Sequence, residues 1–190
     1  MPDPSDREIV AKAIAGDRQA FRQLVERHQQ LVYALAYRFT GRAMDAEDIT
    51  QEAFIRLWKN LARYRDDVLL TTWLYKITTN LCLDFLKSAH NRHARQTVDV
   101  AGTKIVSDSP ADGPVLEEEL KMAMEKFAAA LSPKQKAVFI LRDLEDRDMD
   151  EIAELLEMSP GQVKSNLYCA RKKVSEEIAL HYRSKKPVKP

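Results

Sequence analysis

The polar face of a helical pattern over residues 160–178 is basic. Residues 164–173 contain four bases and no acid, whereas residues 134–163 contain eight acids and four bases. Because DNA phosphates attract the first segment and repel the second, only one helix of this region could approach a duplex. A solvated face of a small helical bundle is the alternative interpretation. The side chains on the face are Lys164, Ser165, Tyr168, Arg171 and Lys172.

Two helices separated by a tight break would position this basic face. The second helix opens with Ser159-Pro160 and then Gln162, a pattern that predicts a capping box. Ala153 on the first helix and Val163 on the second have the spacing of a helix-turn-helix motif. Glu157 falls in the turn, where glycine is usual, so we expect a left-handed glutamate there. One buried stripe is predicted along the second helix, at Val163, Leu167, Ala170 and Val174.

A second polar face begins at a tryptophan. Steps of three, four, four and three place five residues on one side of a helix expected over residues 72–87, namely Trp73, Lys76, Asn80, Asp84 and Lys87. An indole at the head of a partly basic stripe could stack on an unpaired base. The loop before it, residues 64–72, could shape a pocket for that base. The alternative is that Trp73 belongs to the core and that the polar residues face water.

The helix expected over residues 45–61 has a polar side that suits a protein partner. An exposed isoleucine beside a glutamine and a glutamate favours a protein contact over a catalytic site. The acids here lack histidines at ligand spacing, so we expect no metal site. The helix would bury Ile49, Ala53, Leu57 and Leu61, and it would expose Asp48, Gln51, Glu52, Ile55 and Lys59.

The sequence contains no pattern typical of an enzyme. Ser, Cys and His do not combine in a hydrolase motif, and no phosphate-binding loop occurs, so we expect no catalytic residue and no cofactor. His90 and His93 lie in a basic run, which favours a phosphate-facing helix end over a pair of metal ligands. Cys82 and Cys169 lie far apart in the chain, and a disulfide between them is not expected.

Composition and patterning predict a soluble, all-α protein. The chain has 190 residues, of which 45% are hydrophobic, 31% are charged and five are glycine, and its net charge is +1. So few glycines exclude collagen and turn-rich sandwiches. No apolar run approaches the roughly 18 residues of a membrane span. The first residues lack the basic start and apolar stretch of a secretory signal, so we expect a cytoplasmic location.

We expect two small helical domains joined by a flexible acidic linker. Residues 97–120 hold six acids, one base, two prolines and two glycines, which is the composition of a linker. The first domain, residues 1–96, would contain four helices, over about 6–15, a longer segment through Phe21 and Leu35, 45–61 and 72–87. The second domain, residues 121–183, would end in helices over 133–143, 149–157 and 160–178, followed by a basic tail over 184–190.

Several runs of the sequence, taken together, resemble one protein family. They are Gly16-Asp17 through Ala20-Phe21, Leu24-Val25, Asp45-Ala46-Glu47-Asp48-Ile49-Thr50-Gln51-Glu52-Ala53-Phe54, Thr72-Trp73-Leu74-Tyr75-Lys76-Ile77, Asn80, Asp84, and Leu131-Ser132-Pro133 with the helix-turn-helix. In these runs the chain resembles the extracytoplasmic-function (ECF, group IV) sigma factors, the small promoter-specificity subunits of bacterial RNA polymerase. The resemblance covers nearly everything outside the linker and the tails.

The resemblance implies partners and site residues. The partners would be promoter DNA, an anti-sigma factor, and the clamp helices and flap of core RNA polymerase. Core binding would involve Asp48, Gln51, Glu52, Ile55 and Arg56. The minus-ten element would be opened and held by Arg65, Thr71, Thr72, Trp73, Lys76, Asn80 and Lys87. The minus-thirty-five element would be contacted in the major groove by Ser159, Gln162, Lys164, Ser165, Tyr168, Arg171 and Lys172.

Two other functions are compatible with the same helices. One is a helix-turn-helix regulator that binds an operator as a dimer without polymerase. The other is a sigma mimic that sequesters an anti-sigma factor and never touches DNA, although the basic face around Lys164 argues against it. Relatives often carry arginine at the positions of Asn166 and Cys169, so the family pattern does not transfer a promoter sequence to this chain.

Overall fold

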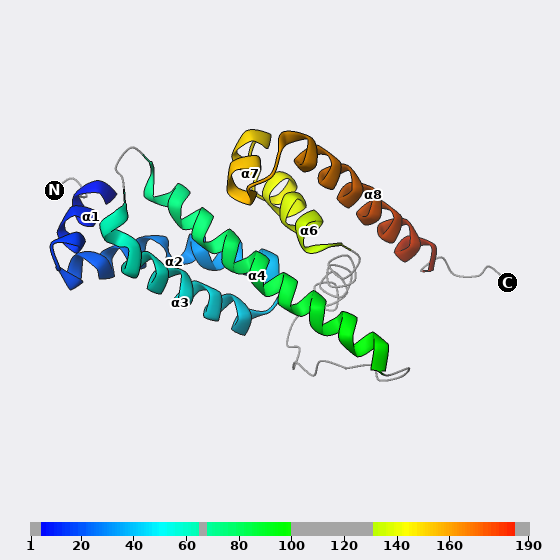
Figure 1. Ribbon diagram of the computed structural model, residues 1–190, viewed down its shortest axis with the longest axis horizontal. Helices are drawn as coiled ribbons and strands as arrows, with labels where there is room; N and C mark the ends of the chain where they lie inside the picture. Colours follow the sequence, from blue (N-terminus) through cyan, green and yellow to red (C-terminus); the bar gives the residue numbers. More distant parts are fainter. Residues whose placement is uncertain (1–4, 65–67, 100–130, 185–190) are drawn as a thin grey trace. The chain divides into compact units, whose positions relative to one another are not determined.

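The computed structural model describes the backbone of residues 5–64, 68–99 and 131–184, and the side chains of these residues except 90–99 and 181–184. All the regular elements within these ranges are helices, in agreement with the all-α prediction. The chain divides into two compact units, Met1–Leu86 and Lys87–Pro190 (Figure 1). None of the described helices is both long enough and apolar enough to cross a membrane.

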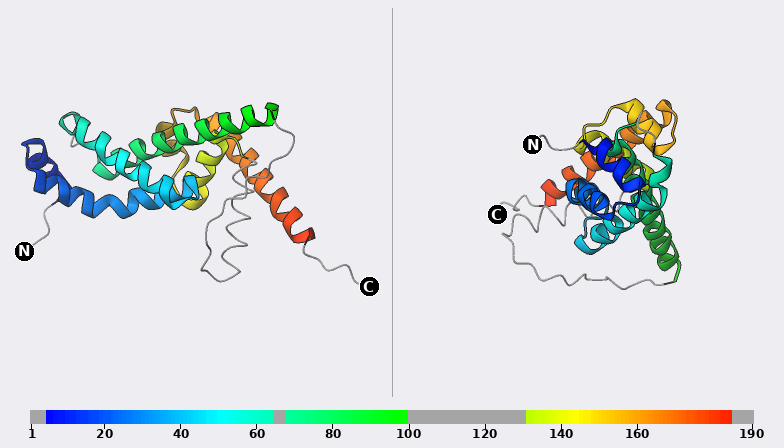
Figure 2. Two further views of the ribbon diagram at one scale, coloured as in Figure 1. Left: turned by 90° about the horizontal axis from the view of Figure 1, so that it is seen from below. Right: turned by 90° about the vertical axis from the view of Figure 1, so that its left-hand side faces the viewer.

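The described part of unit 1 contains four helices and a short 3-10 turn. They are α1 (Asp6–Ile14), α2 (Arg18–Thr40), α3 (Ala43–Asn60), η1 (Leu61–Arg63) and α4, which runs from Leu70 to Asp99 and so crosses into unit 2. Helices α2 and α3 lie side by side (Figure 2). Gly41, at a φ of 70°, ends α2 in the left-handed conformation that glycine adopts without strain. The break between the two helices is therefore only two residues long.

The core of unit 1 follows the predicted apolar spacing. Leu24 and Val32 of α2, Leu57 of α3 and Leu74 of α4 are completely buried. At one end of this core, Asp6 of α1 accepts hydrogen bonds from Arg27 at 3.1 Å and pairs with His28 Nε2 at 2.8 Å. These contacts join the short first helix to α2.

Several helix boundaries in unit 1 differ from the prediction, among them the start of α4, which lies at Leu70 instead of residue 72. Helix α3 begins at Ala43 instead of Asp45, and its N-cap, Arg42, makes no side-chain cap hydrogen bond. Helix α4 runs over Leu70–Asp99, so the expected end at residue 87 is wrong. The segment after Lys87 contains neither glycine nor proline, and nothing in it terminates a helix. The rest of the predicted linker, residues 100–120, lies outside the described residues, and the domain limits 1–96 and 121–183 stay predictions.

Unit 2 packs α6 (Pro133–Phe139), α7 (Met149–Leu156) and α8 (Pro160–Ser184) around a small core. Each of the three opens with a capping box, formed by Ser132 with Gln135, Asp148 with Glu151 and, as predicted, Ser159 with Gln162. The helix expected over 133–143 is regular only to Phe139. It continues as a π-helical turn, η2 (Ile140–Leu144), in which the Glu145 N–H donates to the carbonyl of Ile140 at 3.0 Å.

Candidate nucleic-acid interface and protein-docking surface

Helix α8 separates an apolar side from an exposed polar side, as its sequence predicts. Val163 and Ala170 are completely buried and Leu167 is nearly so, whereas Val174, which was expected in the same stripe, is only half-buried. Lys164, Ser165 and Lys172 are exposed, and Tyr168 is 71% exposed. An aromatic ring so open to solvent at the centre of a basic helix face contributes little to the core. It is available for contact with another molecule.

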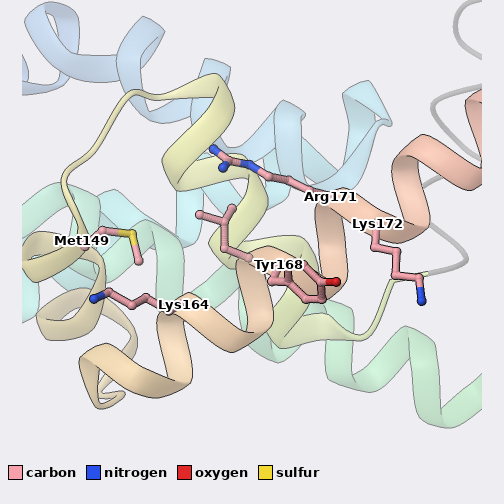
Figure 3. Close-up of a pocket in the computed structure, with 6 residues that line it drawn as sticks. Met149, Lys164, Tyr168, Arg171 and Lys172 are labelled. Carbon is pink, nitrogen blue, oxygen red and sulfur yellow. The ribbon is translucent and has the colours of Figure 1, made fainter.

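The polar side of α8 borders a shallow depression of about 470 Å³ against the start of α7 (Figure 3). The depression combines cationic groups, a phenol and apolar atoms within one unit. That mixture can accept both the phosphates of a nucleic acid and the methyl or ring surfaces of its bases. It is lined by Met149, Lys164, Leu167, Tyr168, Arg171 and Lys172.

The turn between α7 and α8 fixes how this face is presented. Glu157 ends α7 at φ 52° and ψ 49°, the left-handed conformation expected from the sequence. Ser159 Oγ then accepts from the Gln162 N–H at 3.3 Å, and Gln162 Oε1 accepts from the Ser159 N–H at 2.9 Å. Both side chains therefore serve the helix cap, and their assignment to DNA contacts stays a prediction.

Most of the basic residues of α8 already have partners within unit 2. Arg171 pairs with Asp143, Lys172 approaches Glu176 at 3.9 Å, and Lys173 donates to Gln135 Oε1 at 3.1 Å. The hydrogen bonds from Arg171 to Asp143, together with the charge of that carboxylate, raise the pKa of Arg171 above its ordinary value. Lys164 is exposed and makes no ion pair with any described residue.

The second predicted site lies at the start of α4. Trp73 is half-buried, so it is neither a core residue nor a free one, and its ring stacks at a tilt on Tyr64 with centroids 5.5 Å apart. Tyr64 Oη donates to the carbonyl of Val68 at 2.6 Å, which joins the two ends of the preceding loop. Val68 and Leu69 in that loop are 43% and 73% exposed. Two exposed apolar side chains therefore lie in the chain just before the helix that carries Trp73.

The remaining residues assigned to this site are distributed along α4. Thr71 and Lys76 are half-buried, whereas Thr72, Asn80 and Lys87 are exposed. Arg65 lies outside the described residues. The predicted polar face of α4 is thus present, with the fully buried Leu74 on the opposite side of the helix.

The exposed side of α3 carries the residues expected to contact a protein. Asp48 and Gln51 are exposed, Ile55 is 45% exposed, and Arg56 Nε donates to Glu52 Oε1 at 2.9 Å. The sequence reasoning missed Trp58, which is 42% exposed and lies three residues beyond Ile55 on the same side. Its ring packs edge-on against Phe21, with centroids 4.6 Å apart. The spacing from Ile55 was the signal that could have identified it.

Comparison with known proteins identifies the protein family to which each unit is similar. The Sigma-70 region 2 family model matches residues 24–92, and the Sigma-70, region 4 model matches residues 121–174. The chain is 31% identical over 171 residues to the ECF RNA polymerase sigma factor SigW of Bacillus subtilis, covering 86% of this chain and 91% of the relative. The chain belongs to the ECF family of RNA polymerase sigma factors. It is a transcription initiation factor that directs RNA polymerase to specific promoters.

A further relative and two solved structures are also similar to this sigma factor. It is 28% identical to the ECF RNA polymerase sigma-E factor of Escherichia coli (strain K12) over 181 residues, which cover 92% of this chain and 94% of the relative. Among solved structures, CnrH in complex with the cytosolic domain of CnrY matches with a TM-score of 0.63 at 22% identity, over 92% of this chain and 97% of that one. The sigma factor RpoE of Bartonella quintana, solved with the anti-sigma factor NepR, matches with a TM-score of 0.59 at 22% identity, over 84% of this chain and 96% of that one. These two likenesses support the fold.

Within the described residues, no group of three or more His, Cys, Asp or Glu side chains could hold a metal ion.

Proposed function

We propose that α8 of this sigma factor reads the minus-thirty-five element in the major groove. The observation that carries the proposal is the exposed face of α8, with Lys164, Tyr168 and Lys172 pointing out of unit 2. The neighbouring α7 and its flanking residues carry only acids at their exposed charged positions, among them Asp148, Asp150, Glu151, Glu154 and Glu157. Phosphates repelled by α7 and attracted by α8 would leave one orientation for the duplex.

The start of α4 would hold the melted minus-ten strand. The Trp73 ring stacks on Tyr64, and the exposed apolar Val68 and Leu69 lie in the adjoining loop. An unstacked base could stack against these apolar side chains. Lys76 and Asn80, further along the helix, offer hydrogen-bond donors to the strand. Exposing one base costs only a few kcal/mol, which stacking in such a pocket offsets.

The exposed side of α3 would dock on the clamp helices of core RNA polymerase. The surface combines apolar Ile55 and Trp58 with polar Asp48, Gln51 and the Arg56–Glu52 pair, a mixture typical of protein interfaces. Two related folds were solved with the proteins CnrY and NepR, which supports an anti-sigma factor as a further partner. In this proposal the protein acts in the cytoplasm, and it contributes no catalytic group of its own.

Reconstitution with core polymerase tests the proposal. The purified full chain and core enzyme would be combined and used to transcribe a promoter library. The 5′ ends of the transcripts would then be mapped. We expect one family of start sites that share two upstream elements. Lys164→Ala should lower transcription from these promoters at high salt, whereas Lys12→Ala, an exposed lysine of α1, should not.

Two outcomes would contradict the proposal. A footprint of the chain on duplex DNA without core polymerase would favour an operator-binding regulator. Binding of an anti-sigma factor without any promoter-dependent transcription would favour a sigma mimic.

A further inference from the structure

Arg171, one of the predicted DNA contacts, is held in place by a carboxylate of the same unit. Its Nε donates to Asp143 Oδ2 at 3.0 Å, and its Nη2 donates to Oδ1 of the same residue. Two parallel hydrogen bonds of this kind fix the plane of a guanidinium as well as its position. Asp143 belongs to the π-helical turn η2, so the contact joins segments 28 residues apart.

The pairing with Asp143 uses only one edge of the guanidinium. Arginine has five N–H donors, so three of them remain for an acceptor. The Arg171 side chain is 56% exposed, whereas that of Asp143 is only 22% exposed. Arg171 also lines the depression beside Lys164 and Tyr168 (Figure 3). The acid is thus the covered member of the pair, and the arginine is the member that an incoming molecule would reach.

We propose that Asp143 is a positioning residue for promoter binding: it holds Arg171 so that the open edge of its guanidinium meets a phosphate of the duplex seated on α8. The inference rests on the proposed function and deepens it. An unrestrained arginine must lose side-chain freedom when it binds a phosphate, and Asp143 has already restricted Arg171.

A simple count of charges makes the opposite prediction about DNA binding when Asp143 is removed. On that count, an acid beside a DNA-binding face repels phosphates and competes for Arg171, so its removal would tighten binding. Positioning by Asp143 predicts instead that its removal weakens binding. The two accounts therefore differ in the sign of one measurable change.

The experiment compares Asp143→Asn with Asp146→Asn in the full chain bound to core polymerase. Asp146 lies three residues further on, and its side chain is 98% exposed. Its replacement removes the same charge, and asparagine tolerates its left-handed backbone at a φ of 51°. The probe is a labelled duplex carrying a promoter found by mapping transcript starts, and its affinity would be measured over a range of salt concentrations.

For Asp143→Asn we expect binding about threefold to tenfold weaker, with a salt dependence smaller by about one counterion. Asp146→Asn should bind as the wild type does, or slightly more tightly. An Asp143→Asn chain that binds as tightly as Asp146→Asn would overturn the inference. If the wild-type holoenzyme failed to bind any promoter, the proposed function itself would fall, and the inference with it.

A merely structural bridge is distinguished by exchanging the two residues. Asp143→Arg combined with Arg171→Asp restores an ion pair but moves the cation to η2. We expect the exchange to recover the unfolding midpoint lost in Asp143→Asn and to leave promoter affinity low. Recovery of both properties would assign the bridge to stability alone and would overturn the inference.

Discussion

Glu157 holds a backbone conformation that its side chain disfavours. Its φ of 52° lies in the left-handed region, which glycine occupies without penalty. We expect Glu157→Gly to raise the free energy of unfolding of unit 2 by about 1 kcal/mol. Urea denaturation of the full chain would measure the change.

The matched control is Glu154→Gly, an exposed glutamate within α7. There the backbone is helical, so glycine should lower the free energy of unfolding by about 1 kcal/mol. Destabilisation of similar size in both variants would contradict the assigned conformation of Glu157.

The Tyr168 side chain on α8 is exposed and packs little against the core of unit 2. Because its side chain is 71% exposed, Tyr168→Ala should change the free energy of unfolding by no more than about 0.5 kcal/mol. If the ring contacts a base in the major groove, the same change should weaken holoenzyme binding to a promoter duplex about fivefold or more. Fluorescence anisotropy would measure the affinity.

Tyr168→Phe separates the ring from the hydroxyl group. It should retain most of the affinity, because an apolar contact such as that with a thymine methyl uses the ring. Equal losses in the two variants would assign the role to the hydroxyl group and would contradict a ring contact.

The start of α7 depends on one aspartate. Asp148 Oδ1 accepts from the N–H groups of Asp150 and Glu151 at 2.9 and 2.8 Å. Asp148→Ala should therefore lower the free energy of unfolding by about 1 kcal/mol. The control, Asp150→Ala, removes an exposed first-turn acid that favours the helix dipole only, and it should cost about 0.3 kcal/mol. A thermal or urea transition that ranks the two variants equally would contradict the capping assignment.

Helix starts were more predictable from the sequence than helix ends. Ser132, Asp148 and Ser159 each combine a capping side chain with a partner three residues on, and all three boxes are present. Side chains within one helical turn are enough to determine where such a helix begins. Helix α4 lacks any comparable signal at its end, so the predicted stop at residue 87 was wrong.

Features that depend on tertiary contacts were not accessible from the sequence. The π turn η2 and the pairing of Asp143 with Arg171 join residues distant in the chain, and no spacing rule brings an acid of one helix to a base of another. The faces of α3, α4 and α8 were predictable because helical periodicity alone places them. The partner of each basic side chain was not.

At the scale of the whole molecule, two small units would each bind loosely and reinforce one another on one polymerase. Linked sites can gain about 10² to 10⁴ in affinity by effective concentration. Loss of core docking should therefore reduce transcription from every promoter alike, whereas a change on α8 should act through the upstream element.

Ile55→Ser tests whether loss of core docking through α3 affects all promoters alike. We expect core polymerase to bind the variant about fivefold or more weakly, and transcripts from all promoters to fall together. Ile14→Ser is the matched control, because Ile14 on α1 is 48% exposed and Ile55 is 45% exposed. Titration of labelled chain with core enzyme would give the affinity. Equal effects of the two substitutions would contradict docking through α3.

The acids around α7 also affect how the free chain behaves in a cell. Acids and bases nearly cancel over the chain, which carries a net charge of +1. Nonspecific affinity for DNA grows with the number of phosphates that a protein's cations can neutralise. Because the acids around α7 repel phosphates and, of the two helices of the helix-turn-helix, only α8 has a basic face, this chain is expected to spend little time trapped on random genomic sequence.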